Sequence, residues 1–445
     1  MFFKSDLAFI NKVLFLILVS SLNFFTLPVF AKPAAKVKIK IERAENNKIQ
    51  NSLIFPYAFS TDDLGFVLGV GGMITGLHQE QMSVGGTVYG GDETKGLGIG
   101  VWDYRILNSE RLYLSAVGMA GHFPLMRAYS PLPDEFTPAN QARPGSNDSS
   151  FDDFIEASGN SNWFDVRLEY VLPWGAAKKN GMTTYKLQNG LLQEPINIGN
   201  WNPFENGTSV LVARQFNRYQ RYQNEGGDLS GTVRALELGY LYDHTDFPTN
   251  PSKGSSQYFS FTYNPQWLDS NTDWTFLEFE GSKYFSFGET SFAKQNILAL
   301  NMWLGYSPSW DVKYDEQGNS QVANNAPFLE GATLGGMNRM RGFRQNRFHD
   351  KAVIYATAEY RMTLDYNPIK DVRWLKFLNL DWFQAVLYVE GGRVSPTLNK
   401  DVLFTDWKAD AGVSLRMLTA GIVVRLDVTA SNEGTSTWVM VGHPF

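Results

Sequence analysis

The residues that most clearly need a specific chemical partner are Met340-Arg341-Gly342-Phe343, which lie in a polar stretch between strand-like segments. A guanidinium that leaves bulk water needs a carboxylate, because an unpaired buried charge is costly. Arg341 therefore makes sense if its loop folds back into a closed barrel and the side chain meets an acid on the inner wall. Gly342 would let the loop tip turn tightly against that wall.

Alternating sequence near the C-terminus supplies polar faces on which such acids would lie. The clearest faces are Asp410, Ser414 and Arg416 in 409–417, and Arg425, Asp427 and Thr429 in 420–429. In a soluble sandwich the opposite, apolar faces would form the core. In a membrane barrel they would meet lipid, and the polar faces would line the lumen. Periodicity alone leaves both structures open.

The first 31 residues predict a secretory signal peptide cleaved near Ala31. Lys4 and Lys12 supply positive charge, and an apolar core follows over 13–25. The alternative is an uncleaved anchor, but the apolar run is shorter than the ~20 residues that a spanning helix needs. No later run reaches the length of a helical span. The mature chain is therefore expected in an oxidising compartment.

Composition narrows the chemistry further. The chain has no cysteine, which excludes disulfides, thiolate metal sites and a catalytic Cys. Its net charge of −6 argues against nucleic acid as a partner. The 12 Trp, 20 Tyr, 32 Phe and 40 Gly are typical of a chain of many strands, and aromatic girdles are a feature of outer-membrane barrels. A secreted β-rich enzyme has a similar composition and stays open.

The rest of the chain divides into a short tail and one long domain. Residues 32–55 form a Lys-rich tail, which could pair as a strand but is interpreted as a periplasmic lead-in, and 56–445 form a single all-β domain. Residues 121–161 form a long loop. Sixteen candidate strands are expected: 64–74, 81–90, 96–106, 111–120, 162–172, 183–191, 206–217, 232–243, 255–264, 273–285, 293–305, 352–362, 383–392, 409–417, 420–429 and 436–445.

The chain end is typical of the last strand of a closed barrel. An alternating segment ends in Gly442-His443-Pro444-Phe445, and Gly442 and Phe445 are interpreted as a barrel-closing signal. Pro444 cannot donate a ladder hydrogen bond, so it would weaken the seam with the first strand. That first strand, placed at 64–72, is rich in glycine and would also pair loosely, although a curved barrel uses glycine in the same way.

Several segments, in order, resemble one family, the BamA/TamA superfamily of outer-membrane barrels, whose barrel is called the bacterial surface antigen domain. The matching segments are the Arg341-Gly342-Phe343 loop motif, the aromatic strand Leu387 to Gly392 with Glu390 where Asp is usual, the Asp-rich turn from Tyr242 to Gly254, Ala358 to Arg361, Arg425 to Asp427, and Gly442 to Phe445. The resemblance covers 232–445 closely and 56–231 weakly.

The resemblance implies a sixteen-stranded transmembrane antiparallel β-barrel in the outer membrane of a Gram-negative bacterium. It also implies that the sixth outer loop folds inward and carries Arg-Gly-Phe. If Asp427 points inward, alternation places Glu390 inward too, so both are expected partners of Arg341. Glu359, Asp410 and Arg416 are further candidates for this lumen lock and its polar cluster. The lock would act as a static plug, with a moving gate as the alternative.

The chain departs from the family at its N-terminus. Members that insert or export proteins carry periplasmic POTRA modules before the barrel, whereas only about 24 residues lie here between the signal peptide and the first strand. Delivery of a substrate would then need a separate periplasmic partner protein, and the outer loops, 306–350 especially, would carry specificity. Outer-membrane lipid is the expected surrounding, with a monomer favoured.

Residues that could support other chemistry are few. Asp243-His244 could mimic an acid and base pair, but it lies on the family's turn motif. Asp152-Asp153 and the acids of 311–315 could bind a cation, although loop acids are usually just solvated. There is no phosphate loop, dinucleotide fingerprint or His-rich zinc motif, so no catalytic residue, metal or cofactor is expected.

The function hypotheses follow in order. The first is a transport or assembly barrel that helps a protein or lipid substrate enter or cross the membrane, through a plugged lumen or a weak seam. The second is a non-transporting surface or structural barrel, such as an antigen or adhesin. A membrane enzyme is the third.

Overall fold

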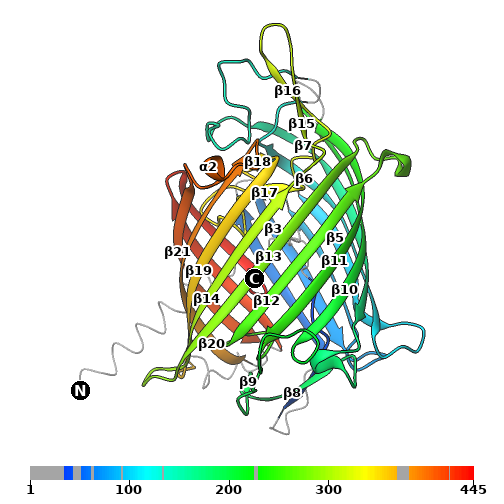
Figure 1. Ribbon diagram of the computed structural model, residues 1–445, viewed down its shortest axis with the longest axis vertical. Helices are drawn as coiled ribbons and strands as arrows, with labels where there is room; N and C mark the ends of the chain where they lie inside the picture. Colours follow the sequence, from blue (N-terminus) through cyan, green and yellow to red (C-terminus); the bar gives the residue numbers. More distant parts are fainter. Residues whose placement is uncertain are drawn as a thin grey trace.

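Sixteen long antiparallel strands form one sheet that curls into a barrel in the computed structural model, which describes residues 35–43, 52–61, 65–91, 94–132, 135–224, 229–367, 380–419 and 421–445 (Figure 1). In sheet order they are β2 (Ser52–Thr61), β3 (Gly65–Thr75), β4 (Ser83–Gly91), β5 (Lys95–Arg105), β6 (Leu112–Ala128), β7 (Ile155–Val171), β10 (Thr208–Gln223), β11 (Leu229–Thr245), β12 (Gly254–Asn264), β13 (Trp274–Gly288), β14 (Ala293–Tyr306), β19 (Ala352–Leu364), β20 (Leu380–Ser395), β21 (Lys408–Thr419), β22 (Ile422–Ser431) and β23 (Gly434–Val441).

The burial pattern of the sheet is inverted relative to that of a water-soluble barrel. On β7, Asp165, Arg167 and Glu169 point inward and are at most 6% exposed, whereas Phe164 and Tyr170 point outward and are at least 38% exposed. Polar inside and apolar outside is the arrangement that lipid requires. The alternation that periodicity left open is therefore that of a membrane barrel. None of the described helices is long and apolar enough to cross a membrane.

Fifteen of the sixteen predicted strands are barrel strands, and one prediction is wrong. The segment 183–191 contributes β8 (Thr183–Gln188), which lies outside the barrel sheet and pairs with β1 (Ile39–Arg43) and β9 (Leu191–Leu192). The barrel's true first strand is β2, which includes Pro56. Proline lacks an N–H and is tolerated on an edge strand, so its presence concealed a strand there.

The two ends of the sheet are β2 and β23. Within the part of the chain that the structure describes, no strand pairing joins them, so the ladder stays open at this seam. The strands beside the seam are also short: β23 has 8 residues and β2 has 10, against 17 in β7 and β11. Gly69 on β3 leaves room for the Tyr57 ring of β2, because a Cβ there would lie 2.2 Å from that ring.

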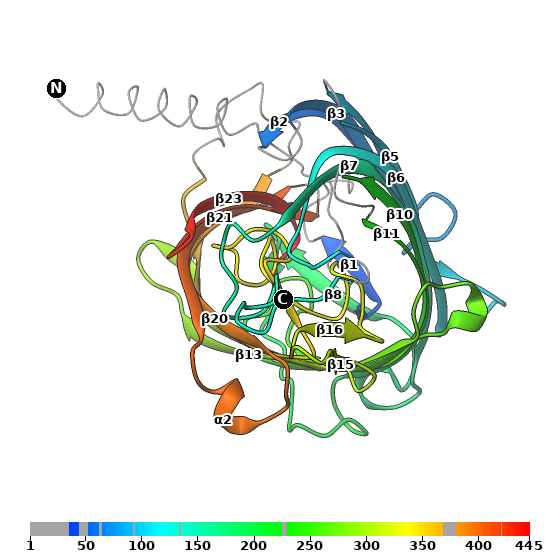
Figure 2. The same ribbon diagram turned by 90° about the horizontal axis from the view of Figure 1, so that it is seen from above.

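The lumen receives chain from both ends (Figure 2). From the upper end in Figure 1, the connection between β14 and β19 folds inward. It carries the hairpin of β15 (Asp311–Tyr314) and β16 (Ser320–Ala323), and the pair β17 (Ala332–Leu334) and β18 (Phe348–Asp350). From the lower end, residues 35–43 enter beside the long connection that holds β8, a 3-10 helix (Gly175–Ala177) and β9. A second 3-10 helix (Gln266–Leu268) and α2 (Lys400–Leu403) lie in other connections.

The signal-peptide prediction falls on residues outside the described part of the chain. Residues 32–55 were expected to form a periplasmic lead-in that could pair as a strand, and the described part does pair, as β1 with β8. Residues 35–43 pack inside the lower mouth, and the barrel begins at Ser52 rather than at residue 56.

Candidate functional site: the lumen loop and its arginine

Residues 335–347 form the inserted loop, which we call the lumen loop. Its base is closed by the antiparallel pair β17 and β18, with Leu334 opposite Phe348. Its tip is closed by backbone bonds from the N–H of Gly336 to the oxygen of Phe343 at 3.1 Å, and from the N–H of Phe343 to the oxygen of Met340 at 3.1 Å. Met340, fully buried, adopts φ 56° in the left-handed region, a strained conformation that this tight turn imposes.

Arg341 lies fully buried at the tip and meets three carboxylates. Its Nε lies 3.1 Å from Glu390 Oε1, its Nη2 3.0 Å from Glu359 Oε1 and its Nη1 3.3 Å from Asp427 Oδ2. Its backbone N–H also donates to Glu390 Oε2 at 2.6 Å. The guanidinium lies over the Tyr388 ring, 3.5 Å from the centroid. One face and all three nitrogens of this cation therefore have partners, as burial requires.

Gly342 sits in contact with the wall. Its N–H donates to Asp410 Oδ2 at 2.9 Å, and its carbonyl accepts from Ser431 Oγ at 2.7 Å. A Cβ at this position would lie 2.7 Å from the Cβ of Asp410, so glycine is needed for close approach and not for an unusual φ. The Trp438 indole N–H donates to the Arg341 carbonyl at 2.7 Å. The tip is thus bonded to five consecutive strands, β19 to β23.

Phe343 completes the motif by packing sideways inside the lumen. It is 1% exposed and meets Phe348 edge to face, with ring centroids 5.3 Å apart. It belongs to an apolar cluster that also contains inward residues of the first strands, Tyr57 and Tyr89 among them. The loop therefore contacts the late strands through charge and fills the remaining lumen with apolar side chains.

A second group of arginines supports the acids from below. Arg416 Nη2 lies 2.7 Å from Glu359 Oε1, Arg361 Nε lies 2.8 Å from Glu359 Oε2, and Arg425 pairs with Asp427. Arg425 also donates to the carbonyl of Met337 at 2.7 Å. Sequence reasoning named Glu359 and Arg416 for this cluster. It missed the roles of Arg361 and Arg425, although alternation placed Arg425 on the same face as Asp427.

The lumen loop carries three more anchored arginines. Arg339 pairs with Glu280 at 2.9 Å and stacks on Trp303, Arg347 pairs with Glu433 at 3.0 Å, and Arg344 lies over the Phe151 ring at 4.0 Å. These partners lie on distant strands and in other loops, so sequence spacing could not identify them. Together they hold the loop over its whole length.

His349 on β18 is buried at the base of the lumen loop, outside the spanning strands. Burial, aided by the nearby Arg143 guanidinium, lowers the pKa of His349 to about 3. Arg143 donates to the His349 carbonyl at 2.7 Å and pairs with Asp350 at 3.2 Å. The imidazole therefore stays neutral at ordinary pH, packed edge to face on Trp310 at 4.9 Å.

With this geometry in place, comparison with known proteins decides the family. A family model described as the Omp85 superfamily domain matches residues 151–437. The chain belongs to the Omp85 superfamily. The match confirms the resemblance to BamA-type outer-membrane barrels, and no POTRA module falls within the matched residues.

Comparison with solved structures gives matches at low sequence identity. CdiB from Escherichia coli is 10% identical, with a TM-score of 0.51 over 88% of this chain and 61% of that chain. BamA from Haemophilus ducreyi lacking POTRA domains 1-3 is 11% identical, with a TM-score of 0.45 over 97% and 78%. CdiB from Acinetobacter baumannii is 11% identical, with a TM-score of 0.44 over 88% and 58%. The chain thus spans less than two thirds of either CdiB chain. A search of curated sequences found no match.

The chain end of this Omp85 barrel differs from the expected closing strand. The last strand, β23, ends at Val441, and Gly442 turns with φ 87°, its N–H bonded to the carbonyl of Val423 at 2.8 Å. Phe445 then stacks on the inward Tyr284 of β13, with centroids 6.4 Å apart. The strand predicted over 436–445 therefore ends early, at Val441, whereas the role of Gly442 and Phe445 as a barrel-closing signal stays a prediction.

The Asp243-His244 pair and the Asp-rich turn, both singled out in the sequence, have structural roles. His244 Nε2 lies 2.7 Å from the carbonyl of Ile198, and Asp243 bonds the Thr245 hydroxyl at 2.6 Å, so this pair ties down a turn. Asp246 accepts the N–H of Ser252 at 2.8 Å, which orders the Asp-rich turn. No cluster of three metal-ligating side chains occurs in the described residues.

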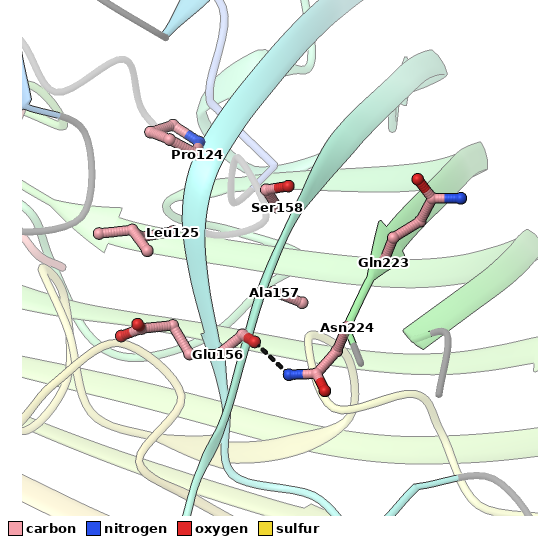
Figure 3. Close-up of a pocket in the computed structure, with 7 residues that line it drawn as sticks. All are labelled: Pro124, Leu125, Glu156, Ala157, Ser158, Gln223 and Asn224. Atoms are coloured by element: carbon pink, nitrogen blue, oxygen red, sulfur yellow. Dashed lines mark hydrogen bonds between the residues drawn. The ribbon is translucent and has the colours of Figure 1, made fainter. Parts of the chain in front are cut away.

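An open pocket of about 310 Å³ lies on the barrel wall (Figure 3). Two of its lining residues, Pro124 and Leu125, lie in the bulge of β6 between Phe123 and Met126. Asn224 spans it by donating to the Glu156 carbonyl. The complete lining is Pro124, Leu125, Glu156, Ala157, Ser158, Gln223 and Asn224. It holds a single carboxylate and no base, which offers no acid–base pair.

Proposed function

We propose that this Omp85 barrel assists a protein or lipid substrate to enter or cross the outer membrane at the seam between β2 and β23. The observation that carries the proposal is that the sheet stays unpaired there, although its two end strands are described. An unpaired strand edge is a template for another strand and an opening toward lipid. Membership of a superfamily of transporters and insertases supports the same function.

The lumen loop serves in this proposal as a static lock. Its tip is bonded to β19 through β23, the strands that lead to one side of the seam. An anchor of this kind holds the late wall rigid while the glycine-rich early strands yield. Delivery of the substrate is assigned in this proposal to a separate periplasmic partner protein.

The test is to join β2 and β23 across the seam with a covalent cross-link, or staple. The chain has no cysteine, so Ile54→Cys on β2 and Val441→Cys on β23 would supply the only two thiols for a bismaleimide cross-linker. Proteoliposomes holding the barrel would receive an eight-stranded outer-membrane barrel from urea, and its folding would be followed by heat-modifiable gel mobility. A parallel assay would follow scrambling of a fluorescent phospholipid.

We expect the unstapled barrel to accelerate client folding or lipid scrambling and the stapled barrel to lose that activity. Each single-cysteine variant treated with the same reagent is the control. If neither activity exceeds that of empty liposomes, the transport proposal fails. A non-transporting surface barrel, the other function considered, would then account for the packed upper loops.

A further inference from the structure

The lower mouth of the lumen holds an extended peptide, which is the chain's own residues 35–43. Within it, β1 pairs in parallel with β8, in register from Ile39 opposite Thr183 to Arg43 opposite Leu187. Figure 2 places β1 and β8 inside the ring of strands. This is strand addition to a short sheet that is not part of the barrel wall, a mode of recognition in which backbone bonds supply affinity.

Two acidic side chains of the barrel wall bind one side chain of this peptide, Lys38. Lys38 Nζ lies 2.6 Å from Glu169 Oε2 and 2.5 Å from Asp103 Oδ1, and the side chains of Lys38 and Glu169 are each 2% exposed. The N–H of Lys36 donates to Glu169 Oε1 at 3.2 Å. The Tyr113 ring lies 5.5 Å from the ammonium. Glu169 thus recognises both the charge and the backbone of the peptide.

The backbone of the wall is distorted to complete this site. Asp103 adopts φ 59°, in the left-handed region, where β5 slips its register against β6 between Val101 and Tyr104. Its N–H bonds Ser115 Oγ at 3.1 Å. Bulges re-aim side chains, and strained backbone of this kind concentrates at binding sites. The bulge turns Asp103 toward Lys38.

The residues at alternate positions of the peptide pack against apolar surfaces. Ala35 and Val37 pack in a cluster with Val171 and Val210 of the wall. Ile39 and Ile41 pack against Tyr185, Leu187 and Phe247 around β8. The site therefore selects an extended segment with apolar residues at every second position and a lysine between them, and it asks little else of the sequence.

We propose that this mouth is an exchangeable peptide-binding site for an extended, lysine-bearing segment of the client protein, and that residues 35–43 occupy it in the resting barrel. The proposal rests on the proposed function, since it names how a client is held. Charge complementarity supports it: the wall supplies Glu169 and Asp103, and the occupant supplies the cation. Only eight residues, 44–51, separate β1 from β2, so a segment held here lies within ~30 Å of the seam strand.

The experiment measures exchange with a synthetic probe in the full-length barrel in detergent. A fluorescein-labelled peptide copying residues 35–43 would be titrated and followed by anisotropy. In one variant, Glu42→Cys and Lys186→Cys, register partners with exposed side chains, form a disulfide that locks β1 on β8. In another, Lys38→Glu repels the chain's own segment from Glu169 and leaves the site intact.

We expect the Lys38→Glu barrel to bind the probe at least 10-fold more tightly than wild type, and the oxidised lock to bind at least 10-fold more weakly than its reduced form. A probe that itself carries Lys38→Glu should not bind. Heat-modifiable mobility checks that each barrel is folded, and changing the probe tests the site without any protein variant.

Equal binding by locked and unlocked barrels, or equal binding of both probes, would overturn the proposal. If client folding proceeds while the probe never exchanges, residues 35–43 are a fixed part of the wall and only the peptide site fails. If the probe exchanges but no client folds and no lipid scrambles, the peptide site stands and the proposed function fails.

Discussion

Two segments enter the lumen from opposite ends, and each is held by one cation, yet the two are built differently. Arg341 meets three carboxylates that are all fully buried, and its planar fork bonds them together. Lys38 meets one buried acid, and its other partner, Asp103, is 34% exposed. The difference fits our proposals that the upper segment is a static anchor and that the lower one can leave.

The two segments are bonded to different parts of the barrel wall. The lumen loop is bonded to β19 through β23, beside one edge of the seam, whereas Lys38 is bonded to β5 and β7. Between β5 and the seam lie β2, β3 and β4, of which β3 and β4 are rich in glycine. One side of the seam is therefore rigidly supported and the other is not.

The largest expected effect breaks the upper anchor. Arg341→Ala would leave Glu390, Glu359 and Asp427 without their shared cation, and losing one partner of a buried pair costs about 3–5 kcal/mol. The free energy of unfolding, followed by thermal unfolding, should fall by that amount. Planar-bilayer conductance should rise as the loop leaves the lumen. Arg339→Ala, whose partner Glu280 is partly exposed, is the matched control and should change both far less. Unchanged conductance and stability would contradict the lock.

A smaller effect tests the close approach of the same loop. Gly342→Ala places a methyl group 2.7 Å from the Cβ of Asp410 and 3.0 Å from that of Ser431. Overpacking of this kind costs about 1–3 kcal/mol. Gly90→Ala, where a Cβ would meet no atom within 4 Å, is the control. Urea unfolding in detergent should separate the two variants, and identical midpoints would show that the tip is not held against the wall.

The base of the lumen loop should respond to acid. Burial holds the pKa of His349 at about 3, below its unfolded value near 6.5, so the unfolded chain binds the extra proton between these values. Stability is therefore complete above pH 6.5 and falls as the pH drops below it, by about 1.4 kcal/mol at pH 5.5. His349→Gln should remove this slope in thermal unfolding between pH 7.5 and 5.5. A slope that persists in the variant would assign it to other groups.

The smallest global effect is expected at the lower segment. Lys38→Ala releases residues 35–43, and water then reaches Glu169, so the whole barrel should lose only about 1 kcal/mol, the size of one net hydrogen bond. Hydrogen exchange followed by mass spectrometry should rise in 35–43 and stay unchanged in 335–347. If exchange rises in both, the two segments are coupled, and the contrast between a fixed and an exchangeable segment is lost.

Local sequence determined much of this protein. Period-two alternation placed fifteen of the barrel strands, and the same alternation put Glu390, Asp410 and Asp427 on one side of the wall, where the structure has them. Arg341 predicted a buried cation that needs a carboxylate if its loop folds inward, because an unpaired buried charge is costly, and the resemblance supplied the inward fold of the loop. These features depend on side-chain chemistry and strand geometry.

Tertiary structure alone decided the remainder, because it depends on which distant segments meet. Alternation is the same for a soluble and a membrane barrel, and only burial showed that the polar face is the inner one. The pairing of β1 with β8 and the inward turn of Phe445 depend on how the sheet curls around a lumen, and Pro56 lies on an edge strand because β2 and β23 do not pair. No local pattern encodes that curvature, since it is a property of all sixteen strands together.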